Sequence, residues 1–166
     1  MKKITAVLVL LLASVLLFSC GGGNPSADDT SAVSASSVVK EPKAIGAALA
    51  AQCAFTDPLE ENDVYLETHP FSFINDKIAG YEAYIAPGIS TEEVFVFEMK
   101  SEADTKALVD RLEAYAEKQR DDFSKYAADE VPKLDDAVIG AYGNFVIYVV
   151  SVDNGAAAQI VEAMMK

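Results

Sequence analysis

The chain has 166 residues, of which 26 are acidic and 13 are basic, so its formal net charge is −13 near neutral pH. This charge repels nucleic-acid phosphates and anionic lipid surfaces, which excludes nucleic acid as a partner and leaves basic proteins or cations. We favour the plainer interpretation, in which the acidic residues keep a soluble domain in solution.

The N-terminal segment has the pattern of an export signal. Lys2 and Lys3 precede an apolar run from Ile4 to Phe18, which only Thr5 and Ser14 interrupt. The run is shorter than the ~20 apolar residues that a transmembrane helix needs, and it has the length of the apolar region of a signal peptide. A glycine-rich break follows directly, which argues against an uncleaved membrane anchor.

The end of this segment is the most informative part of the sequence. Leu17-Phe18-Ser19-Cys20 resembles the bacterial lipobox, in which a branched aliphatic, a variable and a small residue precede cysteine. The resemblance implies that diacylglycerol is attached to Cys20 and that residues 1–19 are removed as the signal peptide. Two or three acyl chains hold a soluble domain stably at a membrane, whereas one chain binds only marginally. We therefore expect an extracytoplasmic protein that is lipid-anchored to the cell membrane.

Two further consequences concern the mature chain. Removal of residues 1–19 takes away Lys2 and Lys3 but no acidic residue, so the net charge falls from −13 to −15. Residues 20–41 then form the lipidated cysteine and a flexible tether, because glycine, serine, alanine and aspartate dominate this stretch without a period or an aromatic residue. A flexible chain of about 20 residues has an r.m.s. reach of about 25 Å.

Residues 42–166 are long enough for one domain with a single core. Apolar residues at helical spacing predict a short helix over 44–55. Residues 59–78 mix acids with aromatic residues, and we expect helical turns and a loop there. Alternating patterns over 79–86 and 93–100, joined at Pro87-Gly88, predict an antiparallel hairpin.

The second strand of that hairpin is apolar on both faces, which places it inside the sheet. The capping box Ser101-Glu-Ala-Asp104 then predicts a helix that runs to about Tyr126, with an apolar stripe facing the sheet. Residues 129–134, which include Pro132, are expected to be a connector.

A second hairpin and a final helix complete the predicted elements. The strands are expected over 137–142 and 145–150, and Gly143-Asn144 is the turn between them. Asp153-Asn154 is expected to cap the last helix. The order is a helix followed by β-β-α-β-β-α, which predicts an α+β fold with an antiparallel sheet of about four strands and the helices packed on one face. The strand order stays open.

The two cysteines do not predict a disulfide or a catalytic site. Lipidation of Cys20 leaves Cys53 without a partner, and its small apolar neighbours favour a buried, inert thiol. A catalytic thiolate would require His69, the single histidine, together with an electropositive setting that an acidic chain does not provide.

Three acidic clusters offer oxygen atoms that could bind calcium, and none of them has the order of an EF-hand loop. They are Glu60-Glu61-Asn62-Asp63, Asp121-Asp122 and Asp135-Asp136. We interpret them as solvated surface. Common catalytic motifs are absent from the sequence. We therefore expect no catalytic, cofactor-binding or metal-binding residue, and Cys20 is the only predicted site.

The second half of the chain resembles a known family. The strand EEVFVFEMK, the helix with Leu108, Leu112, Gln119, Phe123 and Tyr126, and the hairpin DDAVIGAYGNFVIYVVS occur in that order. They resemble short lipoproteins of Gram-positive bacteria that share a domain of unknown function of the DUF4358 type. The resemblance covers about residues 42–165 and implies a fold and a location, but no activity and no site residues.

Three functions remain open from the sequence. We favour a non-catalytic binding domain at the cell envelope, whose partners are the membrane, through Cys20, and a protein or another envelope component. An accessory solute-binding lipoprotein of a transporter is the second hypothesis. The third is an envelope hydrolase that uses carboxylates with or without a metal ion.

Overall fold

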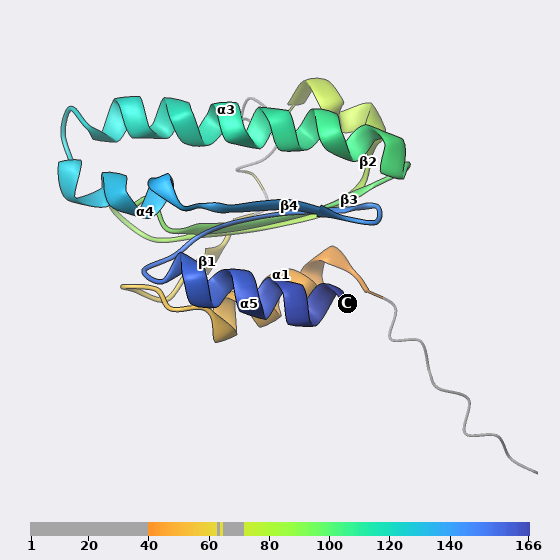
Figure 1. Cartoon of the computed structure of the whole chain (residues 1–166), viewed down its shortest axis with the longest axis horizontal. Coiled ribbons are helices and arrows are strands. Elements are labelled where there is room, and N and C mark those ends of the chain that lie inside the picture. The colour runs from red at the N-terminus through yellow and green to blue at the C-terminus, as the bar shows by residue number, and fades with distance from the viewer. Residues whose placement is uncertain (1–39, 63, 65–71) are drawn as a thin grey trace, which may run out of the picture. The chain divides into compact units, whose positions relative to one another are not determined.

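An antiparallel sheet of five strands, in the order β1-β2-β3-β5-β4, lies at the centre of the molecule (Figure 1). The structure is a computed structural model that describes residues 40–62, 64 and 72–166. Its elements are α1 (Pro42–Gln52), β1 (Glu60–Glu61), η1 (Ser72–Lys77), β2 (Ile78–Ile85), β3 (Glu93–Met99), η2 (Glu102–Asp104), α3 (Thr105–Phe123), η3 (Ala128–Glu130), α4 (Val131–Asp135), β4 (Val138–Tyr142), β5 (Phe145–Val150) and α5 (Asn154–Met165).

The two most apolar strands occupy the middle of the sheet. Every residue of β5 is buried, and in β3 only Glu98 is partly exposed. The two strands pair with each other in antiparallel register, with Phe95 opposite Tyr148. The inner position predicted for the strand over 93–100 is confirmed. Because both faces of these strands are apolar, each face requires a covering layer.

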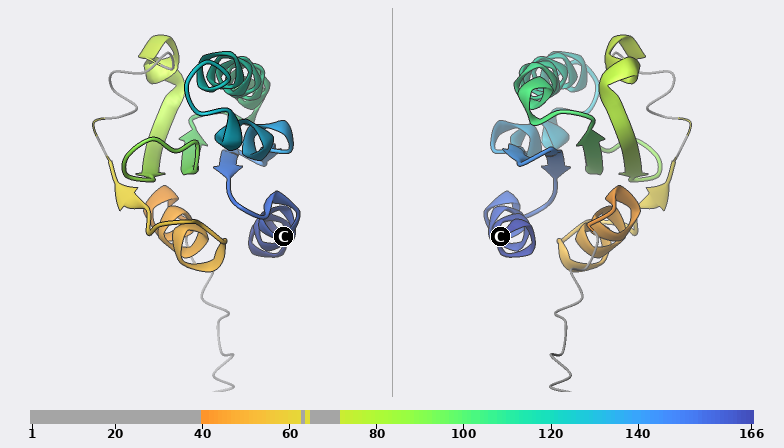
Figure 2. Two further views of the ribbon diagram at one scale, coloured as in Figure 1. Left: turned by 90° about the vertical axis from the view of Figure 1, so that its left-hand side faces the viewer. Right: turned by 90° about the vertical axis from the view of Figure 1, so that its right-hand side faces the viewer.

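Helices provide that layer on both faces of the sheet (Figure 2). The core on the α3 side contains residues of the sheet, α3 and α4: Ala83, Phe95, Phe97, Met99, Leu108, Leu112, Tyr115, Ala116, Leu134, Val146, Tyr148 and Val150. The core on the α1/α5 side contains Ile45, Leu49, Cys53, Val94, Val96, Phe145, Ile147, Val149, Ala157 and Val161. The α+β class is thus confirmed, whereas the expectation that all helices pack on one face is wrong.

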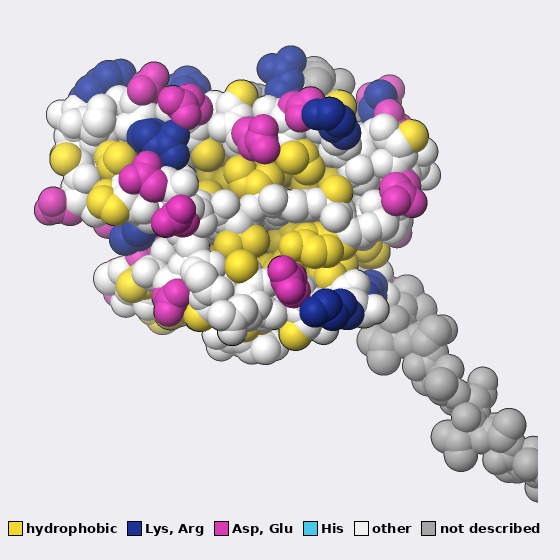
Figure 3. All heavy atoms as spheres, viewed as in Figure 1, with side chains coloured by type: hydrophobic (Ala, Val, Ile, Leu, Met, Phe, Trp, Pro, Cys, Tyr) yellow, Lys and Arg dark blue, Asp and Glu magenta, His cyan; other side chains and the backbone are white. Residues whose placement is uncertain are grey.

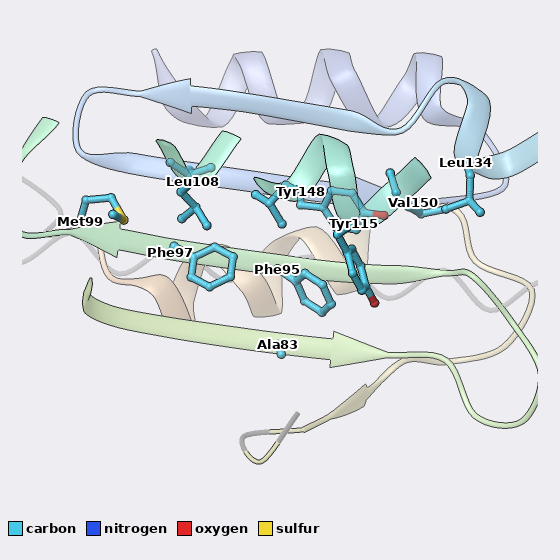
Figure 4. Packing of buried hydrophobic residues seen from close by; sticks show 12 residues of the cluster. Ala83, Phe95, Phe97, Met99, Leu108, Tyr115, Leu134, Tyr148 and Val150 are labelled. Atoms are coloured by element: carbon cyan, nitrogen blue, oxygen red, sulfur yellow. The ribbon is translucent and has the colours of Figure 1, made fainter. Parts of the chain in front are cut away.

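Aromatic rings fill the centre of the core on the α3 side (Figure 4). The rings of Phe95 and Tyr148 stack across β3 and β5 with their centroids 5.4 Å apart. Tyr115 extends from α3 towards the sheet. Its ring centroid lies 6.0 Å from that of Phe95 and 5.9 Å from that of Tyr148. Leu108 and Leu112 of the same helix are fully buried, as their stripe predicted.

The fifth strand and the fourth helix were not predicted. β1 consists of two residues that pair with the end of β2, Glu60 with Ile85 and Glu61 with Tyr84, so it is too short to produce a pattern. α4 occupies the stretch that was expected to be a connector. Proline lies in its first turn, where the missing N–H costs no helical hydrogen bond.

Local signals at turns and helix starts agree with the structure. Gly88 and Gly143 have φ angles of +77° and +61°, which glycine adopts readily in the two hairpin turns. The Asp153 side chain accepts a hydrogen bond from the N–H of Ala156 at 2.9 Å and so caps α5. The Ser101 side chain accepts one from Ala103 N–H at 3.3 Å, but the turn that it begins is the 3-10 helix η2, and α3 starts afterwards.

Candidate functional site

The one predicted site residue, Cys20, lies outside the residues that the structure describes, as do the proposed signal peptide and the tether up to residue 39. His69 and Asp63 also lie outside them. Within the described part of the chain, no helix is both long and apolar enough to span a membrane.

Cys53 packs as a small apolar side chain. It lies in the core on the α1/α5 side, beyond the end of α1, and is buried, with no disulfide partner among the residues that the structure describes. Burial raises the pKa of its thiol, because an apolar environment disfavours the thiolate. This agrees with the structural role predicted for Cys53.

Residues of the three acidic clusters form separate ion pairs with different cations. Glu61 forms an exposed ion pair with Lys43 at 2.7 Å. Asp122 pairs with Lys118 and Lys125 on the surface of α3, and Asp135 pairs with Arg120 at 2.9 Å. The hydrogen bonds from Lys118 and Lys125 lower the pKa of Asp122. Among the residues that the structure describes, no group of three or more His, Cys, Asp or Glu side chains is arranged to hold a metal ion.

A buried ionic network joins distant loops at one end of the sheet. The Glu92 carboxylate is fully buried and accepts hydrogen bonds from Thr56 N–H at 2.6 Å and from the Thr56 hydroxyl at 2.5 Å. Lys133 of α4 donates to Glu92 at 2.7 Å and to both oxygens of Glu130 at 2.8 and 2.9 Å. Glu130 also accepts from Thr91 N–H at 3.0 Å. The network holds α4, η3, the β2–β3 loop and the loop after α1 together.

Lys133 keeps its charge in this setting. Burial lowers the pKa of its ammonium group, but the hydrogen bonds and the charges of Glu130 and Glu92 outweigh this effect and raise it. The same ion pair lowers the pKa of Glu130 against the opposing effect of burial. Both partners are therefore ionised near neutral pH.

Asn154 extends the network to the start of α5. Its side chain donates to the carbonyl of Lys133 at 2.7 Å and accepts from Ser151 N–H at 2.8 Å. A depression of about 530 Å³ lies over this junction, and it is lined by Pro132, Lys133, Asp136, Ser151, Val152, Asp153, Asn154 and Gly155.

Glu93 occupies a different environment, although it follows Glu92 directly. It lies between β3 and α3, where Tyr115 donates to it at 3.2 Å and Gln119 at 2.8 Å. Burial raises the pKa of Glu93 to about 8, and hydrogen bonds from Tyr115, Gln119 and Tyr148 oppose the rise only in part. Glu93 is therefore a neutral carboxylic acid at pH 7.

Both carboxyl groups are buried and hydrogen-bonded to other parts of the domain, so they belong to its packing. Sequence reasoning missed them, since it treated 93–100 only as an apolar strand. The available signal was a pair of consecutive acids at the start of a strand that is otherwise apolar on both faces.

Part of the chain matches a known family of domains. Residues 70–151 match the family model of a domain of unknown function, DUF4358. The DUF4358 part of the resemblance is confirmed over this range. No curated protein and no solved structure matches the chain.

The DUF4358 range contains β2 to β5, α3, α4 and the acids Glu92 and Glu93, whereas α1, β1 and α5 lie outside it. The core on the α3 side is built entirely from the DUF4358 domain. The core on the α1/α5 side is completed by flanking helices.

Three of the exposed large apolar side chains lie at the same end of the sheet as the ionic network. Ile89 is 70% exposed, Tyr126 61% and Val152 56%. Ile89 belongs to the β2–β3 loop, Tyr126 follows α3, and Val152 lies two residues after Val150, the residue of β5 that pairs with Glu93. This end of the domain offers apolar contact to a partner.

Proposed function

We propose that the chain is a lipid-anchored protein of the bacterial cell envelope whose α+β domain binds a partner without catalysis. The observation that carries the proposal is the lipobox-like sequence Leu17-Phe18-Ser19-Cys20 directly after an apolar signal segment. Lipidation of Cys20 would place the domain outside the cytoplasm, on a tether that leaves it free to contact a neighbour.

The surroundings of the carboxyl groups favour binding over catalysis. A catalytic carboxyl must be able to reach a substrate, and its pKa is matched to that task. Glu93 has a strongly raised pKa, but it is only 3% exposed and its oxygens contact Tyr115 and Gln119. Glu92 is fully enclosed by Thr56 and Lys133. These two groups serve the fold, and the exposed side chains serve contact.

Metabolic labelling with an alkyne analogue of palmitate tests the anchor. We expect the full chain, expressed in a Gram-positive host, to take up the label and to sediment with membranes. Cys20→Ala should lose the label and remain with its signal peptide uncleaved. Cys53→Ala is the matched control, because the second cysteine is buried and should not affect labelling. An unlabelled wild-type chain, or a labelled Cys20→Ala chain, would contradict the proposal.

The depression near Lys133 favours one alternative, an accessory solute-binding lipoprotein. Its lining includes Lys133 and the polar residues Ser151 and Asn154, together with Asp136 and Asp153, which suits a small polar solute. A ligand that binds the folded state at 100 times its Kd stabilises it by about 2.7 kcal/mol. A thermal-shift screen of metabolites therefore separates the two proposals, since a clear rise in the midpoint would favour solute binding.

A further inference from the structure

The two edges of the sheet differ in how they are protected. β1 forms one edge and consists of two exposed glutamates, which are the kind of short, charged strand that discourages pairing with another chain. β4 forms the other edge with Val138, Ile139, Gly140, Ala141 and Tyr142. It has no charged residue and no proline, and its register with β5 is regular. The usual protective features are absent from β4.

The backbone of β4 is available on its outer side. β5 is its only partner in the sheet that the structure describes. Tyr142 and Phe145 close a two-residue turn as a hydrogen-bonded pair, and such pairs alternate along an antiparallel ladder. The N–H and C=O groups of Ile139 and Ala141 therefore point away from β5. An added strand would find these groups at the correct spacing.

Apolar side chains flank this edge on both faces. Val109, Ala137 and Ile139 are partly buried beside the core on the α3 side, and Val138, Tyr142, Ile160 and Met164 beside the core on the α1/α5 side. In Figure 3, which views the molecule from the β4 edge as in Figure 1, apolar surface forms one band between α3 and the level of β4 and a second band between that level and α5. Side chains of an added strand would alternate between these two bands.

The charges next to the edge are not symmetrical. A depression of about 320 Å³ on the α3 side is lined by Glu113, Glu117, Asp135 and one cation, Arg120, together with Ala116, Leu134, Ala137 and Ile139. Arg120 already bonds Glu117 at 2.6 Å and Asp135 at 2.9 Å. On the α5 side Glu162 is balanced by Lys166 at 3.7 Å. The excess of negative charge therefore lies on the α3 side.

We propose that β4 binds an extended segment of a partner protein by strand addition, and that basic residues in this segment alternate with apolar ones. The basic side chains lie over the depression with Glu113, and the apolar ones lie over Tyr142 and Ile160. The inference rests on the proposed binding function and gives it a site and a partner chemistry.

Charge selects this occupant over a second copy of the chain. A two-fold antiparallel pair of β4 strands keeps α3 of both copies on the same face of the continuous sheet. That arrangement would bring the acidic lining of one copy, with Glu113 and Glu117, towards the same residues of the other. Like charges at close range disfavour such a pair.

Amide hydrogen exchange of the purified full chain, followed by NMR, tests the proposal with two synthetic probes. The first is an octapeptide of alternating lysine and valine, and the second replaces each lysine with glutamate. At ten times its Kd, the lysine peptide should slow exchange of the Ile139 and Ala141 amides about tenfold. The glutamate peptide should leave both amides unchanged.

Variants separate the backbone contact from the charge contact. Ala141→Pro removes an outward N–H without removing a hydrogen bond to β5, and it should abolish the protection of Ile139. Glu113→Gln should weaken binding of the lysine peptide and tests the charge contact even if the proline variant unfolds. Glu60→Gln, at the opposite edge of the sheet, is the matched control and should leave binding unchanged.

Three results would overturn the inference. They are the absence of protection by the lysine peptide, equal protection by both peptides, and protection that rises with protein concentration alone, which would identify a second copy. None of these results affects the labelling of Cys20, so failure of this site and failure of the proposed anchor remain distinguishable.

Discussion

Glu92 and Glu93 are consecutive buried acids with different kinds of partner. Glu92 is ion-paired with Lys133, whereas the donors to Glu93, which include Tyr115 and Gln119, are neutral. A buried carboxylate needs a cation to remain charged, and without one it takes up a proton instead. The difference between the two acids follows from the partners that α4 and α3 supply.

The raised pKa of Glu93 predicts that stability depends on pH. Below about pH 4.5 the carboxyl is protonated in both folded and unfolded chains. Between about 4.5 and 8 the folded chain holds a proton that the unfolded chain has lost, so the free energy of unfolding falls as the pH rises. Glu93 contributes a slope that approaches about −1.4 kcal/mol per pH unit to the free energy of unfolding in that window. Above the window this slope returns to zero.

Urea unfolding of the wild type and of Glu93→Gln at several pH values tests this dependence of stability on pH. We expect the variant to lose the slope and to be more stable than the wild type at pH 8 by roughly 1–3 kcal/mol. Glu102→Gln, at an exposed position, is the control and should retain the wild-type slope. An unchanged slope in Glu93→Gln would show that another group titrates.

Lys133 is expected to contribute strongly to stability. Lys133→Ala leaves the fully buried Glu92 carboxylate without its cation, and removing one partner of a buried pair typically costs about 3–5 kcal/mol. Chemical denaturation measures this loss. Lys106→Ala breaks the exposed pair with Asp110 and should have little effect, since surface ion pairs add little. Equal losses in both variants would contradict the role of burial.

Among the elements, the two terminal helices begin in different ways. α5 has the side-chain cap of Asp153, whereas α1 begins after Glu41 without a side-chain cap, with proline in its first turn. Asp153→Ala should therefore destabilise the protein by about 1 kcal/mol, the usual cost of losing such a cap. Glu41→Ala is the matched control and should be close to neutral. Thermal unfolding of both variants measures the difference.

The sequence predicted the elements better than their layers. Alternation and the turn at Gly143-Asn144 predicted the second hairpin, and the stripe through Leu108 and Leu112 predicted α3. A stripe shows that a helix has a buried side, but it does not say which face of the sheet that side covers. The apolar character of both faces of β3 already required two layers, and the one-face arrangement conflicted with it.

The ionic network could not be predicted because its members are far apart in sequence. Glu92 meets Lys133 across 41 positions and Thr56 across 36. Local pattern contains no information about such contacts. Pro132 also obscured α4, because proline marks a break in most positions and is compatible with a helix only in the first turn.

At the scale of the whole molecule, the DUF4358 range is not a complete folding unit. A fragment of residues 70–151 would lose α1 and α5 and expose the face that contains Val94, Val96, Ile147 and Val149. We expect this fragment to unfold without a cooperative transition or to aggregate, whereas residues 40–166 should unfold in one transition. Circular dichroism during heating compares the two. A cooperative fragment would show that the flanking helices are dispensable.

The position of α1 also determines how the domain responds to mechanical load. Any pull from the N-terminal side enters the described domain at Lys40 and reaches α1 first. α1 packs on the sheet through side chains such as Ile45 and Leu49, and at Gly46 it lies so close to β2 that an added Cβ would be 3.0 Å from Glu82 and Tyr84. Such a helix can peel away one turn at a time, while the sheet keeps its ladder of backbone hydrogen bonds. A first helix that detaches before the strands separate would protect the sheet from a force applied on the N-terminal side.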